Sequence, residues 1–186
     1  MQRKDINRGA FAIDDVLYAE ECSVRIRRAE DHGFELAPIT TAKGFKVDLE
    51  TRNNDRVIFD DFALANLLWS RVRHVIPEIL AGRQAIGLNE RFRLYRYAQG
   101  QRFSWHSDGA FQRENGEMSL LTFMIYLNDG YTGGETRFEG TKVVGRTGMA
   151  LVFHHGVVHE GAEVTEGRKY ALRSDVMYGA VGKLGG

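Results

Sequence analysis

The chain has 186 residues, of which 43% are hydrophobic, so it is long and apolar enough to form one domain with a substantial core. Its 25 basic and 25 acidic residues give a formal net charge of zero, which argues against a general attraction to nucleic acids or anionic membranes. The N-terminal residues lack the apolar core of a signal peptide, and no segment approaches the roughly 20 apolar residues that a membrane span needs. We therefore expect a cytoplasmic protein.

Two helices are predicted in about the first 84 residues, where we expect them to form a helical support for the rest of the domain. The first spans residues 19–32 and stops at Gly33. The second begins after Asp60, a candidate N-cap, and runs towards Pro77. Its apolar residues fall on one stripe, at the spacing of a helix that packs on a sheet: Leu64, Leu68, Val72, Val75 and Ile76.

Short strands separated by glycine-containing turns are predicted from residue 85 to about residue 180. They span residues 86–97, 119–127, 134–138, 141–144, 149–154 and 168–178. In the last of them Lys169, Arg173 and Asp175 share one face, which needs polar partners, while the other face is apolar. The pattern predicts a mainly β fold with flanking helices, a sandwich or jelly roll whose polar face is turned towards a barrel interior.

A histidine and an aspartate separated by one residue, His106 and Asp108, are the first candidate metal ligands. In a strand the side chains at i and i+2 point to the same side, so these two can bind one ion. His159, from a distant segment, would complete two histidines and one carboxylate on one face of the ion, which suits non-haem Fe(II) oxygenases. The short motif alone is a weak signal because it often occurs by chance, so its context carries the prediction.

Six blocks in the second half of the chain supply that context. They span residues 95–108, 121–128, 133–138, 148–153, 159–161 and 167–176. In their residues and order, these blocks resemble the prolyl 4-hydroxylase-like branch of the Fe(II)/2-oxoglutarate-dependent dioxygenases. The resemblance implies a double-stranded β-helix, a cupin-like jelly roll, over about residues 85–180 of a single domain that spans residues 1–186.

The resemblance also implies how the site is divided between the metal and a cosubstrate. His106, Asp108 and His159 would be ligands of Fe(II). Lys169, the basic residue that follows the second histidine, would hold the distal carboxylate of 2-oxoglutarate, since a dianion that chelates iron at one end needs a buried cation at the other. Arg168 is a weaker candidate because it falls on the opposite strand face.

Three further residues are candidates for the cosubstrate pocket. Tyr126 matches a family position whose hydroxyl helps to hold the distal carboxylate, and Tyr97 matches an aromatic position that lines the pocket. Plain core packing is the alternative for both tyrosines. Arg173 is expected to reach the cosubstrate, Asp108 or the substrate, and a structural pair with Asp175 is an equal alternative.

The implied reaction is hydroxylation by O2 with conversion of 2-oxoglutarate to succinate and CO2, and L-ascorbate is a candidate reductant. A carboxylate at position 108 favours this reaction over halogenation, because halogenating relatives have a small residue there.

We expect the substrate to be a prolyl or other side chain of a protein, peptide or free amino acid. The alternatives are a dealkylase or small-metabolite oxidase of the same superfamily and a non-catalytic barrel, including a cupin-type zinc or manganese site. The net charge disfavours nucleic acid as a substrate, and the oligomeric state stays open.

Two segments are expected to shape the substrate groove, residues 51–56 and 109–117. Arg52 and Asn54 are candidates to bind a peptide backbone or a carboxylate, although an Asx turn explains this polar segment equally well.

For four further residues near the motifs, the sequence predicts a position but no specific role. Glu135 and Arg137 are placed near the opening of the site. His154 and His155 precede His159 but are predicted in the turn beyond the preceding strand, where they would support the ligands from behind or face solvent rather than bind the metal.

Overall fold

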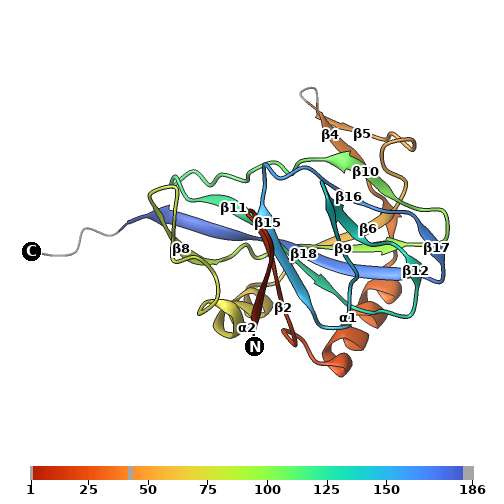
Figure 1. Ribbon diagram of the computed structural model, residues 1–186, viewed down its shortest axis with the longest axis horizontal. Helices are drawn as coiled ribbons and strands as arrows, with labels where there is room; N and C mark the ends of the chain where they lie inside the picture. Colours follow the sequence, from red (N-terminus) through yellow and green to blue (C-terminus); the bar gives the residue numbers. More distant parts are fainter. Residues whose placement is uncertain (1, 42–43, 182–186) are drawn as a thin grey trace, which may run out of the picture.

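The computed structural model describes residues 2–41 and 44–181, and this part of the chain contains two helices and eighteen strands. The fold is a jelly roll, as predicted. A large antiparallel sheet has both helices against one face, and a small sheet lies over part of the other face (Figure 1). Neither helix in the described residues is long and apolar enough to cross a membrane.

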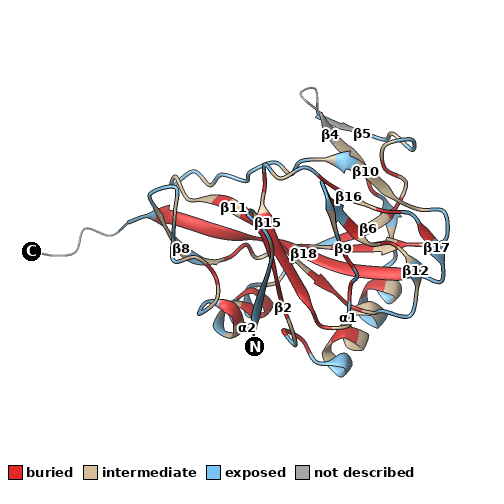
Figure 2. Ribbon diagram, in the orientation of Figure 1, coloured by how far each residue is buried: buried red, intermediate tan, exposed pale blue. Residues whose placement is uncertain are grey.

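The large sheet has ten strands within the described residues, in the order β1-β2-β15-β11-β18-β9-β6-β3, with β8 beside β18 and β7 beside β8. Their bounds are β1 Arg3–Asn7, β2 Ala10–Ile13, β3 Glu35–Leu36, β6 Asp55–Asp60, β7 Ile79–Leu80, β8 Arg83–Leu88, β9 Arg91–Tyr97, β11 Met118–Tyr126, β15 Ala150–His154 and β18 Lys169–Ala180. The centre of this sheet, β11 and β18, is buried (Figure 2).

The small sheet has the order β10-β16-β13-β14. Its strands are β10 Phe103–His106, β13 Thr136–Phe138, β14 Thr141–Val143 and β16 His159–Gly161. Two separate strand pairs complete the described structure: β4 Ile39–Thr41 with β5 Gly44–Lys46, and β12 Thr132–Gly133 with β17 Val164–Glu166.

The helices are α1, Ala19–His32, and α2, Phe62–Val72. The predicted N-cap of the second helix was wrong by one residue: Asp61, not Asp60, accepts a hydrogen bond from the backbone N–H of Leu64, at 2.8 Å. Asp60 instead ends β6 and forms an ion pair with Arg91 across the sheet, so pairing between strands determines where the helix begins.

Other boundaries also differ from the predictions. The predicted strand 86–97 is two strands, β8 and β9, because both pair with the same side of β18 and the chain steps at Asn89 between them. Asn89 is buried and its side-chain oxygen accepts the backbone N–H of Arg91. The first 84 residues, expected as a helical support, also contribute strands β1, β2, β3, β6 and β7 to the large sheet.

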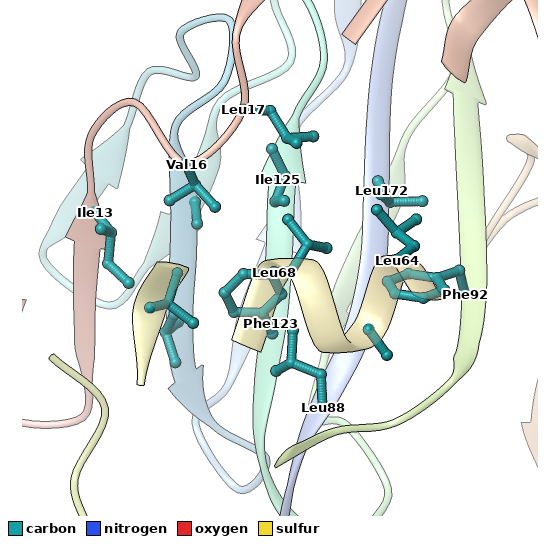
Figure 3. Close-up of a cluster of buried hydrophobic side chains, with 14 of the residues drawn as sticks. Ile13, Val16, Leu17, Leu64, Leu68, Leu88, Phe92, Phe123, Ile125 and Leu172 are labelled. Atoms are coloured by element: carbon teal, nitrogen blue, oxygen red, sulfur yellow. The ribbon is translucent and has the colours of Figure 1, made fainter. Parts of the chain in front are cut away.

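The main hydrophobic core lies between the helices and the large sheet (Figure 3). Leu64 and Leu68 of α2 point towards Phe92, Phe123 and Leu172 on the strands. The predicted apolar face of β18 lies here, which leaves its polar residues on the opposite face of the sheet. The core therefore determines which side of the sheet can carry a site.

Replacing Leu68 with alanine is expected to reduce the free energy of unfolding by about 2–5 kcal/mol, because it leaves a cavity in this core. Leu68 is 0% exposed, whereas its neighbour Leu67 is 38% exposed on the outer side of the same helix. Urea denaturation of Leu68→Ala and of the matched control Leu67→Ala measures the difference. Equal losses of stability in the two variants would show that α2 does not pack as described.

Candidate active site

The three predicted metal ligands converge where the small sheet meets the large one. His106 ends β10 and His159 begins β16, and the two residues are paired across these strands. Asp108 lies two residues beyond the end of β10, so a loop places it, not the strand alternation that we expected; its backbone N–H donates to the carbonyl of His155. One donor atom from each ligand residue lies within 4.8 Å of the others.

The orientation of both imidazoles is determined by backbone hydrogen bonds. Nδ1 of His106 lies 2.7 Å from the carbonyl oxygen of Ser104, and Nδ1 of His159 lies 2.9 Å from that of Val157. A carbonyl oxygen only accepts, so both Nδ1 atoms carry the proton and both Nε2 lone pairs are free. Each Nε2 lies 3.9 Å from one oxygen of Asp108, so the three free donors face one point.

The ionisation states of these residues also suit a divalent metal. Burial lowers the pKa of His106 to about 4 and lowers that of His159 below its ordinary value. Burial alone would raise the pKa of Asp108, but the charge of Arg173, with a hydrogen bond from Thr122, holds it at about 2. Two neutral imidazoles and one carboxylate are the forms that bind metal, and this donor set fits Fe(II).

A chain of hydrogen bonds supports Asp108 from behind. Thr122 donates to Asp108 at 2.5 Å, so its hydroxyl oxygen is left to accept from Nδ1 of His155, at 3.0 Å. Nε2 of His155 then accepts from Ser119, at 2.8 Å, and Ser119 accepts from the backbone N–H of Phe111. The carboxylate of Asp108 is thus connected to the loop 109–117. Sequence reasoning found neither Thr122 nor Ser119, because nothing in the local pattern marks them.

Arg173 and the neighbouring histidines take up three different environments. Nη2 of Arg173 lies 3.2 Å from both Asp108 and Asp175, so the two alternatives predicted for this residue, contact with Asp108 and a pair with Asp175, occur together. His155 is 7% exposed and lies behind the site, in one of the two positions predicted for it. His154 is the last residue of β15, where the predicted strand 149–154 also ends, so its placement in the turn beyond that strand was wrong.

A buried cation lies at the inner end of the cavity that contains the ligands. Lys169 is 2% exposed, and its Nζ donates to the carbonyl of Gly134 at 2.7 Å. The rings of Tyr97 and Tyr126 lie 5.1 and 5.3 Å from Nζ, and within the described residues no carboxylate lies within 4 Å of it. Burial lowers the pKa of Lys169 to about 8. This arrangement provides a site for an anionic group.

The close approach at Lys169 requires glycine at position 134. Gly134 has a φ of +64°, and a Cβ there would lie 3.0 Å from Val164 and 3.3 Å from Lys169 Cδ. Arg168, the rejected alternative, is exposed and pairs with Glu30 on the helix side of the sheet.

The tyrosines predicted in the cosubstrate pocket occupy different positions. Tyr97 lines the same cavity as Lys169 and the candidate metal ligands. The Tyr126 hydroxyl is hydrogen-bonded to Thr136 at 2.6 Å, and Thr136, not Tyr126, is among the residues that line this cavity. Thr136 was missed by sequence reasoning, although it alternates with charged residues along the strand, a signal that could have placed it on the inner face.

On its outer side the cavity opens into a groove of about 510 Å³. The cavity and groove share five lining residues, including His106 and Asp108. Both segments expected to shape a substrate groove contribute, through Thr51 and Arg52 on one side and residues 109–111 on the other. Glu135 and Arg137 were expected near the opening but pair with each other at 3.4 Å and do not line the groove.

A sequence model of the 2OG-Fe(II) oxygenase superfamily matches residues 92–174, which include all three candidate ligands and Lys169. No curated protein matches the chain.

Several solved structures have a similar fold. The viral collagen prolyl hydroxylase from Paramecium Bursaria Chlorella virus-1, solved as a 2OG complex, is 20% identical with a TM-score of 0.66, over 94% of this chain and 97% of that one. The Pseudomonas putida prolyl-4-hydroxylase is 19% identical with a TM-score of 0.64, over 90% and 92% of the two chains. A Trichoplax adhaerens prolyl hydroxylase in complex with a hypoxia inducible factor peptide fragment is 17% identical with a TM-score of 0.70, over 91% and 84%.

Replacing His155 with alanine is expected to weaken metal binding by about 10- to 100-fold, because Thr122 loses the donor that orients it towards Asp108. Calorimetric titration with Mn(II) under anaerobic conditions measures the affinity. His154→Ala is the matched control, since His154 makes no such contact with Thr122. Unchanged affinity in His155→Ala would contradict a role for the hydrogen-bond chain.

Proposed function

Since the chain belongs to the 2OG-Fe(II) oxygenase superfamily and is a 2-oxoglutarate-dependent dioxygenase, we propose that it hydroxylates a prolyl or other side chain of a protein, peptide or amino acid. His106, Asp108 and His159 would bind Fe(II), and Lys169 would bind the distal carboxylate of 2-oxoglutarate. The observation that carries this proposal is that the three-residue cluster and the buried cation lie on one cavity. L-Ascorbate is proposed as the reductant and the cytoplasm as the location.

The protein's residues position and shield the reaction. When bound, Fe(II) supplies the O2-dependent oxidation of a substrate C–H bond that is coupled to conversion of 2-oxoglutarate to succinate and CO2. Arg173 and Thr122 hold the Asp108 carboxylate in one orientation. Phe153 packs against the ring of His159, with centroids 4.5 Å apart, and helps to exclude water.

The open groove supports a peptide or amino-acid substrate. It reaches the candidate ligands from the surface, so an extended chain can lie in it while one side chain enters the site. The Trichoplax adhaerens prolyl hydroxylase, which has the same fold, was solved with a peptide fragment bound. Screening peptides and small metabolites by mass shift would separate this proposal from a dealkylase or small-metabolite oxidase.

The central test is spectroscopic. Anaerobic addition of Fe(II) and 2-oxoglutarate to the wild-type protein is expected to produce the visible metal-to-ligand charge-transfer band. His106→Ala and Asp108→Ala are expected to lose it, because each removes one of three ligands. Absence of the band from folded wild-type protein, or its persistence in both variants, would rule out the proposed site.

Lys169→Met is expected to weaken 2-oxoglutarate binding by about 10- to 100-fold, since a hydrogen bond to a charged group contributes roughly 1.5–3 kcal/mol. Metal binding should be unaffected, because Lys169 makes no contact with the candidate ligands. Anaerobic calorimetry with Mn(II) and 2-oxoglutarate measures both affinities. Arg168→Met, which removes an exposed cation next to it in the chain, is the matched control, and equal 2-oxoglutarate affinities in the two variants would contradict the assignment.

Lys169→Met is also expected to stabilise the folded protein in the absence of cosubstrate. Burial lowers the pKa of Lys169 from 10.5 to about 8, so the unfolded state binds more protons between these values. Lys169 therefore costs stability below pH 8, and this cost disappears as the pH rises towards 10.5. The gain in unfolding free energy of Lys169→Met, about 1–3 kcal/mol at pH 7, should shrink over that interval in urea denaturation. A pH-independent difference would show that the buried charge is not its cause.

A further inference from the structure

Arg52 is a buried cation without a counter-ion beside the candidate metal ligands. It is 6% exposed, and its Nε donates to the side-chain oxygen of Asn54 at 2.8 Å. Its Nη2 is buried without a hydrogen-bond partner, and within residues 2–41 and 44–181 no carboxylate forms an ion pair with it. An unpaired buried guanidinium is costly, so a ligand that supplies the missing acceptor would bind favourably here.

The surrounding structure holds this guanidinium in one place. A β-bridge pairs Arg52 with Phe103, in the strand that ends at His106. The guanidinium carbon lies 4.7 Å from the ring centre of Tyr95 and 4.3 Å from that of Phe103. Phe103 in turn stacks on His106 with ring centres 3.5 Å apart. Arg52 is therefore preorganised one aromatic layer away from a candidate metal ligand.

The other arginines of the groove are mostly neutralised. Five arginines and two aspartates line it. Arg56 pairs with Glu35, Arg91 pairs with Asp60, and Arg173 pairs with Asp108 and Asp175.

Arg93 is the exception among these arginines. Its Nη1 is buried without a hydrogen-bond partner. Its ion pair with Asp175 is long, with 3.8 Å between Nη1 and the carboxylate oxygen. The unsatisfied donors of the groove are thus concentrated on Arg52, Arg93 and Nε of Arg173, close to the metal ligands.

We propose that Arg52 binds a carboxylate of the substrate, and that the substrate is an acidic peptide or an amino-acid derivative with a free carboxylate. This inference rests on the proposed function. A planar guanidinium matches a carboxylate through paired hydrogen bonds, which fixes the orientation as well as the affinity of the bound group.

The position of Arg52 favours the substrate over the cosubstrate. Arg52 lines the outer groove but is not among the residues of the inner cavity, which ends at Lys169. A nucleic acid would need a row of unpaired cations for successive phosphates, whereas four of the five groove arginines lie within 4 Å of a carboxylate and Arg52 alone has none among the described residues.

Octapeptide pools with a randomised central residue test the proposal. The flanking positions carry Asp/Glu, the isosteric Asn/Gln or Lys/Arg mixtures. The Fe(II) enzyme should convert 2-oxoglutarate to succinate fastest with the acidic pool, and fluorescence anisotropy of labelled pools should show the same order of binding. Arg52→Met should weaken binding of the acidic pool by about 10- to 100-fold and leave the Asn/Gln pool unchanged.

Two further variants keep the test specific. Arg52→Lys retains the charge without the planar fork and should keep only part of the acidic preference, which also covers the case in which Arg52→Met fails to fold. Arg73→Met removes an exposed cation at the end of α2 and should leave the preference intact. Comparing N-acetyl amino acids with their amides distinguishes a free α-carboxylate from an acidic side chain.

Other outcomes would overturn the proposal. Equal binding of the acidic and Asn/Gln pools would contradict it, as would Arg52-dependent binding of a labelled oligothymidylate in preference to the acidic pool. If Arg52→Met lowers 2-oxoglutarate affinity but not the acidic preference, Arg52 belongs to the cosubstrate site, while the proposed function stands. Failure of the proposed function itself is visible separately, as loss of 2-oxoglutarate binding in the wild-type protein.

Discussion

The ion pair between Asp108 and Arg173 is the contact on which the rest of the site depends. Asp108 belongs to the loop that follows β10 of the small sheet, whereas Arg173 lies within β18 at the centre of the large sheet. A buried charge that loses its partner is strongly destabilising, so this ion pair favours the arrangement in which the two sheets lie together. The same arrangement brings His106 and His159 to the carboxylate and aligns their free nitrogens on it.

Buried cations at two places around the candidate ligands make the site suitable for anionic groups. Lys169 has a neutral acceptor and two aromatic rings as neighbours, and Arg52 has an amide and two aromatic rings. Neither arrangement satisfies the charge in the way that Asp108 and Asp175 satisfy Arg173. Residues that break the rule that buried charges are paired are typical of binding sites, where a ligand completes the pairing.

The predictions from sequence were correct where the pattern of apolar and polar residues within one strand or helix is sufficient to define its faces. The alternation along β18 correctly separated its apolar face from the face of Lys169 and Arg173, because the strand is packed on both sides. The predictions failed where a neighbouring strand decides the outcome. Asp60 pairs with Arg91 instead of capping α2, and Asp108 is positioned beyond the end of β10 by a hydrogen bond to His155.

By itself, the sequence determined the type of fold, the set of candidate ligands and the presence of a basic residue at position 169, because these depend on residue type, order and short periodicity. Only the tertiary structure decided that Tyr126 bonds to Thr136, that His155 supports Asp108 and that Arg52 lacks a counter-ion. Each of these depends on distances between segments far apart in the chain, and strand register and sheet closure determine such distances.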